Sequence, residues 1–282
     1  MVIDSVGVLG CGLMGAGIAQ TCAAAGYRTI VRDVNEAMVE KGIGRIRASL
    51  EHAVGKGKLT GEARDGALAN LSGVTDLNAL SGCDVIIEAI VEDRDEKRRT
   101  YEALDALVAP HVLLLSNTSS LCITELAAMT RRPDRFGGLH FFNPVPVMPL
   151  VEVIRGMATS DETYEQTLAL ARALGKEPIT APDRPGFIVN RLLVPYLLDA
   201  IRAYEQGLGS LEDIDRGMKL GCGHPMGPFT LLDYVGLDTI YYIANIMYEE
   251  FRESSYAPPP LLKRMVLAGR LGRKSGRGFY AY

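Results

Sequence analysis

Apolar runs alternate with helix-like segments along the first half of the chain. The runs predict strands at residues 6–9, 27–32, 84–90 and 112–116, and helices are expected at 13–25, 36–54 and 94–108. Apolar runs without polar alternation suit parallel strands that are covered on both faces. The order strand–helix–strand therefore predicts a Rossmann-like α/β domain with a doubly wound, mostly parallel sheet.

The pattern changes after Thr180, where residues 181–186 form a cluster rich in proline and glycine. Beyond this cluster, the apolar spacing predicts helices at 187–206, 211–218, 229–251 and 261–268. We therefore divide the chain into a first domain, residues 1–183, and a smaller all-helical domain, residues 184–282. Because the helical part is small and apolar, we expect it to form a homodimer interface.

Composition excludes several classes of protein. The net charge of −4 gives no reason to expect a nucleic-acid or membrane partner. The five cysteines are scattered and form no CxxC pair, which favours free thiols in a reducing compartment and argues against a metal site. The apolar stretch near the N-terminus is short and no Lys or Arg precedes it, so it does not resemble a signal peptide. We expect a cytoplasmic protein.

A glycine-rich loop lies where a dinucleotide would bind. Gly10, Gly12 and Gly15 form GxGxxG directly after the first predicted strand. These glycines permit a tight turn, close approach of a pyrophosphate and close packing of helix on strand. Leu13 and Met14 open the following helix, whose N-terminus offers unpaired N–H groups and a positive dipole to the phosphates.

The second predicted strand ends at an acidic residue. Asp33 lies 18 residues past Gly15, about where a carboxylate accepts the ribose hydroxyls of the dinucleotide. This carboxylate would repel a 2′-phosphate, so NAD is expected rather than NADP. Arg32 could accommodate such a phosphate, or it could be a solvent-facing residue at the strand end.

A histidine and a glutamate stand on either side of a proline-rich turn. His140 follows a β-like run at 135–139, and Glu152 lies in the apolar run 150–154, which predicts the next strand. The turn would bring the carboxylate back beside the imidazole, fixing the tautomer of the ring and strengthening it as a general base. From these residues alone, His140 could also be a packed structural residue, and Glu152 a surface acid on an edge strand.

Six segments together resemble the L-3-hydroxyacyl-CoA dehydrogenase family, and in particular its bacterial 3-hydroxybutyryl-CoA dehydrogenase branch. They follow the family's order and spacing over essentially the whole chain, at residues 10–15, 116–121, 138–148, 184–191, 224–228 and 272–280. The chain ends where the family's module ends, which implies the single-function enzyme without a fused hydratase domain.

The resemblance implies roles for residues that the motifs alone leave open. It makes His140 the base and Glu152 the residue that orients it, with Ser119 binding substrate and Asn190 completing the catalytic site. Ser119 could otherwise cap a helix near Ile123, and Asn190 could be an ordinary polar residue on a helix surface.

Further positions are implied on the cofactor side and for coenzyme A. The cofactor-side residues are Ala89, Glu92, Lys97, Asn117 and Ser119. Ser49 and Lys56 match the family's contacts to coenzyme A, although Lys56 could also belong to a solvated helix end.

The implied reaction is oxidation of an (S)-3-hydroxyacyl-CoA thioester to the 3-oxoacyl-CoA, or the reverse, with NAD. Two other functions stay open. One is a related NAD-dependent dehydrogenase that acts on a non-thioester hydroxy acid. The other is a non-catalytic NADH-binding protein, although such a protein has no need of a base.

Overall fold

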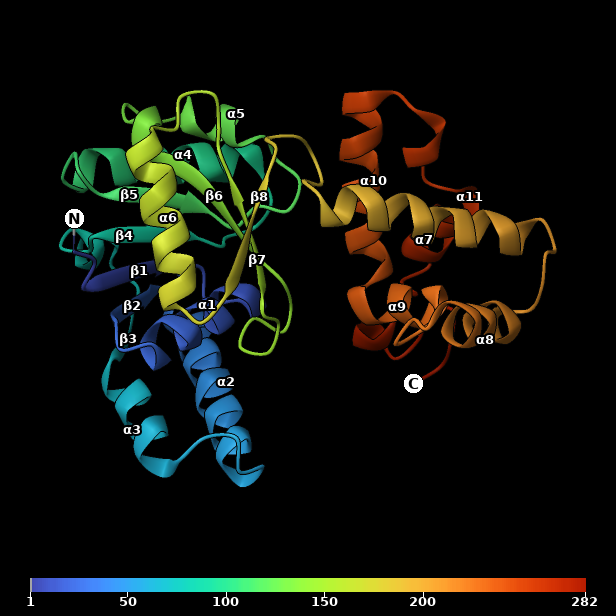
Figure 1. Cartoon of the computed structure of the whole chain (residues 1–282), viewed down its shortest axis with the longest axis horizontal. Helices are drawn as coiled ribbons and strands as arrows, with labels where there is room; N and C mark the ends of the chain where they lie inside the picture. The colour runs from blue at the N-terminus through green and yellow to red at the C-terminus, as the bar shows by residue number, and fades with distance from the viewer. Residues whose placement is uncertain (1) are drawn as a thin grey trace. The chain divides into compact units, whose positions relative to one another are not determined.

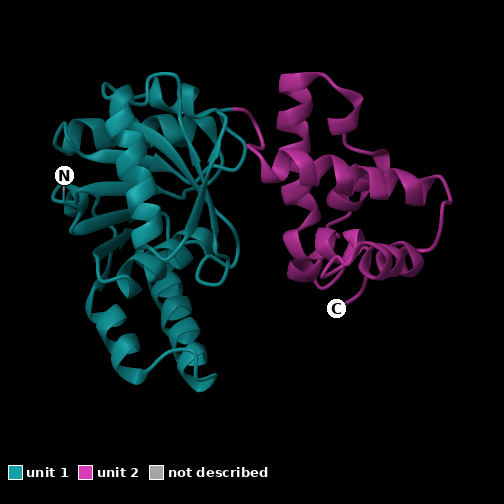
Figure 2. Ribbon diagram, viewed as in Figure 1, with its two compact units in different colours: residues 1–183 teal, residues 184–282 magenta. Residues whose placement is uncertain are grey.

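The computed structural model describes residues 2–282. The chain divides into two compact units, residues 1–183 and residues 184–282 (Figure 2). Within the described residues, no helix combines the length and the apolar character that a membrane span requires.

The first unit is built on one eight-stranded sheet (Figure 1). In spatial order the strands are β3 (Leu71–Val74), β2 (Arg28–Arg32), β1 (Ser5–Leu9), β4 (Val85–Glu88), β5 (Leu113–Ser116), β6 (Phe136–Phe141), β7 (Leu150–Ile154) and β8 (Glu177–Ala181). Every neighbouring pair is parallel except β6 and β7, which form an antiparallel pair. The Rossmann-like, mostly parallel fold predicted for this part of the chain is confirmed.

Helices connect and cover these strands. They are α1 (Leu13–Ala24), α2 (Glu36–Gly55), α3 (Gly61–Ala69), α4 (Arg94–Leu107), α5 (Ile123–Ala127) and α6 (Asp161–Ala173). Several begin at a side chain that accepts a backbone N–H of the first turn, as Asn35 does for Met38 and Asp93 for Glu96. In contrast, α1 begins at Gly12 with no side-chain cap, so the first N–H groups of this helix remain available to a ligand.

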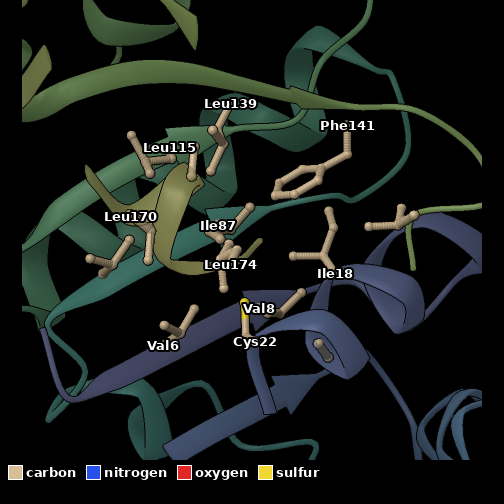
Figure 3. Packing of buried hydrophobic residues seen from close by; sticks show 14 of the residues in the cluster. Val6, Val8, Ile18, Cys22, Ile87, Leu115, Leu139, Phe141, Leu170 and Leu174 are labelled. Carbon is tan, nitrogen blue, oxygen red and sulfur yellow. The ribbon is translucent and has the colours of Figure 1, made fainter. Parts of the chain in front are cut away.

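The main core lies between the sheet and the helices α1 and α6 (Figure 3). Ile18 of α1 and Leu170 of α6 are fully or almost fully buried there, against strand residues such as Val8 and Leu139. Side chains alternate across a strand, so the neighbours of Leu139 in β6 point to the opposite face. On that face Tyr101 of α4 packs against Phe136, with ring centroids 5.0 Å apart.

Four elements of the first unit were not predicted, namely β3, α3, α6 and β8. The edge strand β3 is only half-buried and contains Ser72 and Gly73, so it shows no apolar run. The helix α3 has a single buried residue, Ala67, and so lacks an apolar stripe.

The second unit is all-helical. Its helices are α7 (Val189–Glu205), α8 (Leu211–Cys222), α9 (Pro228–Val235), α10 (Leu237–Phe251) and α11 (Pro260–Leu267). The continuous helix predicted at 229–251 is wrong. Gly236 breaks it with a φ of 104°, a conformation that only glycine adopts readily, while the apolar periodicity continues on both sides.

The C-terminal segment folds back onto this unit. The backbone N–H groups of Phe279 and Tyr280 donate to the carboxylate of Asp233 at 2.9 and 2.8 Å, and the Tyr280 hydroxyl donates to Asp215 at 3.1 Å. Asp233 is buried, and a Cβ on Gly278 would lie 1.9 Å from its Oδ1, so glycine is required for this approach.

Candidate active site

His140 and Glu152 are direct partners in the antiparallel pairing of β6 and β7. Nδ1 of His140 lies 2.7 Å from Oε2 of Glu152, and the two side chains are 6% and 0% exposed. Glu152 is not a surface acid on an edge strand, because β8 pairs with β7 on its other side and places Ile179 beside Glu152. The contact selects Nε2 as the ring nitrogen that can exchange a proton with a substrate.

A buried lysine holds the turn between these two strands. Nζ of Lys176 donates to the carbonyl oxygens of Val145 and Met148 at 2.6 and 2.9 Å. Burial lowers the pKa of this ammonium group. Because both acceptors belong to the turn 143–149, Lys176 fixes the connection that places Glu152 opposite His140.

The glycine loop has the shape that a pyrophosphate requires. Gly10 adopts a φ of 90°, and a Cβ there would lie 2.5 Å from the carbonyl oxygen of Ala89. A Cβ on Gly15 would lie 1.9 Å from the carbonyl oxygen of Gly10, whereas a Cβ on Gly12 would meet nothing within 4 Å. Gly10 and Gly15 thus serve protein packing, while Gly12 leaves open space at the uncapped start of α1. These residues fit a dinucleotide.

Asp33 lies against this loop at the end of β2. Its Oδ2 accepts the N–H of Cys11 at 2.6 Å, and its Oδ1 accepts the N–H of Val34 at 2.7 Å. Each carboxylate oxygen retains a lone pair for a ribose hydroxyl. The neighbouring Arg32 donates from Nε to the carbonyl oxygen of Thr75 at 3.0 Å, which favours its interpretation as a strand-end residue.

A buried lysine links two carboxylates at the carboxyl end of β4. Nζ of Lys97 lies 2.6 Å from Oε1 of Glu88 and 3.0 Å from Oε2 of Glu92. Glu88 also accepts the hydroxyls of Tyr101 and Ser116 at 2.6 and 2.7 Å. Two carboxylates around one ammonium group leave one net negative charge, and the hydroxyl donors stabilise it.

The pKa shifts of this network follow from its charges. Burial alone would raise the pKa of Glu92, but Lys97, Thr118 and the N–H of Ser119 outweigh burial and hold that pKa below its usual range. Burial would lower the pKa of Lys97, but Glu88 and Glu92 outweigh it and raise that pKa. Both groups are therefore ionised at neutral pH, and the network is a fixed electrostatic feature of the site.

The residues after β5 connect this network to the histidine. Oδ1 of Asn117 accepts the N–H of Phe141, next to His140, at 2.9 Å. The N–H of Ser119 donates to Oε1 of Glu92 at 3.2 Å, and the hydroxyl of Thr118 donates to the same oxygen. Asn117 thus contacts the strand of His140, and Ser119, two residues later, contacts Glu92.

Ser119 does not cap the helix near Ile123. That helix, α5, begins after Cys122, and the carboxylate of Asp183 accepts the N–H groups of Ile123 and Thr124 at 2.6 and 2.8 Å. The capping role that Ser119 could have had belongs to Asp183, and Ser119 remains a candidate for the substrate.

Comparison with known proteins agrees with this geometry. Residues 5–184 match the profile of the 3-hydroxyacyl-CoA dehydrogenase NAD binding domain, and residues 186–282 match the C-terminal domain of the same enzyme. The chain belongs to the 3-hydroxyacyl-CoA dehydrogenase family. The predicted family and the predicted NAD cofactor are confirmed.

Relatives from distant organisms match this family member over nearly their whole length. A 3-hydroxybutyryl-CoA dehydrogenase of Mycobacterium tuberculosis is 51% identical over 282 residues, 99% of each chain. The human mitochondrial hydroxyacyl-coenzyme A dehydrogenase is 47% identical, over 100% of this chain and 92% of its own. The crystal structure of an (S)-3-hydroxybutyryl-CoA dehydrogenase from Ralstonia eutropha has a TM-score of 0.95 and 48% identity, and covers 100% of this chain and 99% of that chain.

The remaining residues with an implied role belong to the second unit and to α2. Asn190 belongs to the second unit, near the start of α7, so its role stays a prediction. Ser49 lies on α2 and lines a pocket of about 170 Å³ beside α1, whereas Lys56 is the exposed residue that ends α2.

Sequence reasoning missed several residues that shape the site of this 3-hydroxyacyl-CoA dehydrogenase. Glu88 carried a signal, because it is a carboxylate inside an apolar run that predicts a buried strand. Asp183 follows Pro182 in the breaker cluster, where a capping acid is common. No sequence signal pointed to Lys176, because its partners are backbone carbonyl groups that the turn brings near it.

Proposed function

We propose that this protein interconverts (S)-3-hydroxyacyl-CoA and 3-oxoacyl-CoA with NAD(H), and that 3-hydroxybutyryl-CoA is among its substrates. The observation that carries the proposal is the buried contact between Nδ1 of His140 and Glu152. It supplies a general base at the carboxyl end of a sheet whose first turn fits a dinucleotide. The relatives named 3-hydroxybutyryl-CoA dehydrogenase support the choice of substrate.

His140 moves the proton of the reaction. In the oxidative direction, Nε2 accepts the proton of the 3-hydroxyl group, and C3 becomes a carbonyl carbon as its hydride leaves. When bound, the nicotinamide of NAD supplies the acceptor for that hydride. A positioned base of this kind contributes a rate factor of about 10²–10⁴.

Glu152 supports the histidine in two ways. It holds the ring by its contact at Nδ1, which keeps Nε2 directed to the substrate. It also stabilises the imidazolium that forms, because a carboxylate without competing water interacts strongly with a neighbouring cation. Glu152 is therefore proposed as the residue that orients and stabilises the base.

Ser119 and Asn190 would hold the reacting oxygen atoms by hydrogen bonds. For Ser119, support comes from its contact with Glu92 and from its position two residues after Asn117, which contacts the strand of His140. For Asn190, support comes from the family resemblance alone. Positioning of this kind is a large part of catalysis, because it removes the entropic cost of orienting the substrate.

Coenzyme A is proposed to bind along α2. Ser49 and Lys56 lie seven residues apart, about two turns of the helix, and so face the same side. Replacement of Lys56 by Ala should raise KM for the thioester. An unchanged KM would place the coenzyme elsewhere.

The test is a rate measurement on the purified protein. NADH oxidation is followed by absorbance with acetoacetyl-CoA, with thioesters of longer acyl chains, and with the free 3-oxo acid, and NADPH is measured in parallel. Turnover of the thioester and not of the free acid supports the proposal. Turnover of the free acid alone favours a non-thioester dehydrogenase, and NADH binding without turnover of any substrate favours a binding protein.

A homodimer formed by the helical unit is part of the proposal. An apolar hollow of about 460 Å³ on this unit is lined by residues of α7 and by His224, Pro225 and Met226. Leu192 is 73% exposed and lines this hollow, so its side chain adds to an apolar surface that a second copy of the chain could cover. Leu192→Glu should shift the mass measured by light scattering from dimer to monomer, whereas Val2→Glu on the first unit should not. A dimeric Leu192→Glu protein would contradict this interface.

We also propose that the protein acts in the cytoplasm. The thiols of its five cysteines are free, which is typical of a reducing compartment.

A further inference from the structure

A pocket beside the glycine loop contains a cation to which neither the motifs nor the family resemblance gives a role. The pocket has a volume of about 170 Å³ and lies between α1, α2 and the proline-rich turn. Leu13 and Val145 form part of its apolar wall, and Gln20, Arg45 and Ser49 are among its polar residues. None of the residues that line it is acidic.

Arg45 is the charged group of this pocket. Its side chain is half-buried, and no ion pair or hydrogen bond of its guanidinium occurs within residues 2–282. Arg132 differs from Arg45 in this respect, because Asp105 and backbone carbonyl groups bind the guanidinium of Arg132. Arg45 precedes Ser49 by four residues on α2, so the two side chains lie one turn apart on one face.

The size and lining of the pocket limit what it can hold. A volume of about 170 Å³ is smaller than a pocket that encloses a whole nucleotide, so only part of a larger ligand fits. An apolar wall with a few amide and hydroxyl groups suits a narrow chain of methylene and amide units. A planar guanidinium at its edge suits a phosphate group, with which it forms two parallel hydrogen bonds.

We propose that Arg45 binds a phosphate of coenzyme A and that the pantetheine arm of the thioester lies in this pocket. The proposal rests on the proposed function and adds a residue to its substrate site. Lys56 lies 11 residues after Arg45, about 16 Å along the helix, and would meet a second phosphate of the same coenzyme. Arg45 and Lys56 would then bind the diphosphate and the 3′-phosphate, which both belong to the nucleotide half of coenzyme A.

The pyrophosphate of NAD is the other phosphate that Arg45 could reach. Arg45 is near enough to Cys11, in the glycine loop, to act on the pKa of its thiol. The experiment therefore measures both ligands. Arg45→Met is compared with wild type and with Arg47→Met, a control on the exposed side of the same helix.

Steady-state rates are measured with acetoacetyl-CoA and with S-acetoacetyl-pantetheine, which carries no phosphate, and NADH binding is measured by fluorescence titration. For Arg45→Met, KM for acetoacetyl-CoA should rise roughly tenfold or more, while KM for the pantetheine thioester and Kd for NADH stay unchanged. Arg45→Lys should recover part of the loss, and Arg47→Met should behave as wild type.

Equal increases in KM for both thioesters would overturn the proposal and show a structural effect. A rise in Kd for NADH with KM for acetoacetyl-CoA unchanged would assign Arg45 to the cofactor instead. A wild-type protein that turns over no thioester would refute the proposed function itself, an outcome distinct from a wild-type enzyme that Arg45→Met leaves unaltered.

Discussion

His140 and Glu152 face each other across β6 and β7, with Nδ1 of the imidazole 2.7 Å from Oε2 of the carboxylate. Glu152→Gln keeps the shape of the side chain and removes its charge. It should lower kcat by about 10²-fold or more, because the amide can favour the wrong tautomer of the ring and lacks the charge that stabilises the imidazolium. Kd for NADH should stay close to wild type. A variant with wild-type kcat would show that Glu152 has only a packing role.

Substitutions of two glycines in the dinucleotide loop should have different effects on stability and on NADH binding. A Cβ on Gly12 meets nothing within 4 Å in the protein, so Gly12→Ala should leave thermal stability unchanged while NADH binding weakens. A Cβ on Gly15 would lie 1.9 Å from the carbonyl oxygen of Gly10, so Gly15→Ala should reduce both stability and binding. Calorimetry and fluorescence titration measure the two properties. Unaltered NADH affinity in Gly12→Ala would mean that the phosphates do not approach this position.

Asp33 should determine the choice between NAD and NADP. Its carboxylate is fixed by the N–H groups of Cys11 and Val34, which place it to accept ribose hydroxyls. Asp33→Ala should therefore weaken NADH much more than NADPH, whose 2′-phosphate the carboxylate repels. Titrations of wild type and Asp33→Ala with NADH and with NADPH give the ratio of the two losses of affinity. Equal losses of affinity would be incompatible with a ribose contact.

The lysine between Glu88 and Glu92 should matter for stability. Lys97→Met leaves two carboxylates without their cation in a buried position, so the free energy of unfolding should fall by about 3–5 kcal/mol near pH 7. Arg99→Met removes an exposed ion pair to Glu96 on the same helix and should cost little. Urea denaturation of the two variants measures the difference.

This stabilisation should depend on pH in a defined direction. The lowered pKa of Glu92 means that its contribution is present above about pH 4.3 and is lost as the pH falls through the folded-state pKa. The raised pKa of Lys97 means that its contribution is present below about pH 10.4 and is lost as the pH rises further. The stability difference between wild type and Lys97→Met should shrink in acid. A difference that grows below about pH 4 would be inconsistent with the ion pair.

Much of the fold could be predicted because local patterns and tertiary structure agree there. The β1–α1–β2 unit has an apolar strand, a glycine turn and a small-residue helix in order, and each agrees with the same parallel sheet. The prediction of strands and helices failed where the apolar pattern carries no information on the backbone. The edge strand β3 has no apolar run, and the periodicity that spans α9 and α10 does not record the backbone turn at Gly236.

The site was predictable to the extent that its residues are near in sequence. His140 and Glu152 belong to one antiparallel pair, so a turn of suitable length was enough to bring them together. The contacts of Lys97 with Glu88 and Glu92 depend on how α4 packs behind β4, which no local pattern specifies. Arg45 is likewise defined by the packing of α2 against α1 and the proline-rich turn.

The most direct test of the proposed mechanism is single-turnover oxidation of NADH by acetoacetyl-CoA in His140→Ala, with NADH affinity measured on the same preparation. The rate should fall by about 10²–10⁴-fold while Kd for NADH remains near the wild-type value, because the imidazole transfers a proton and does not hold the dinucleotide. A rate close to wild type, or a large loss of NADH binding, would contradict the assignment of His140 as the base.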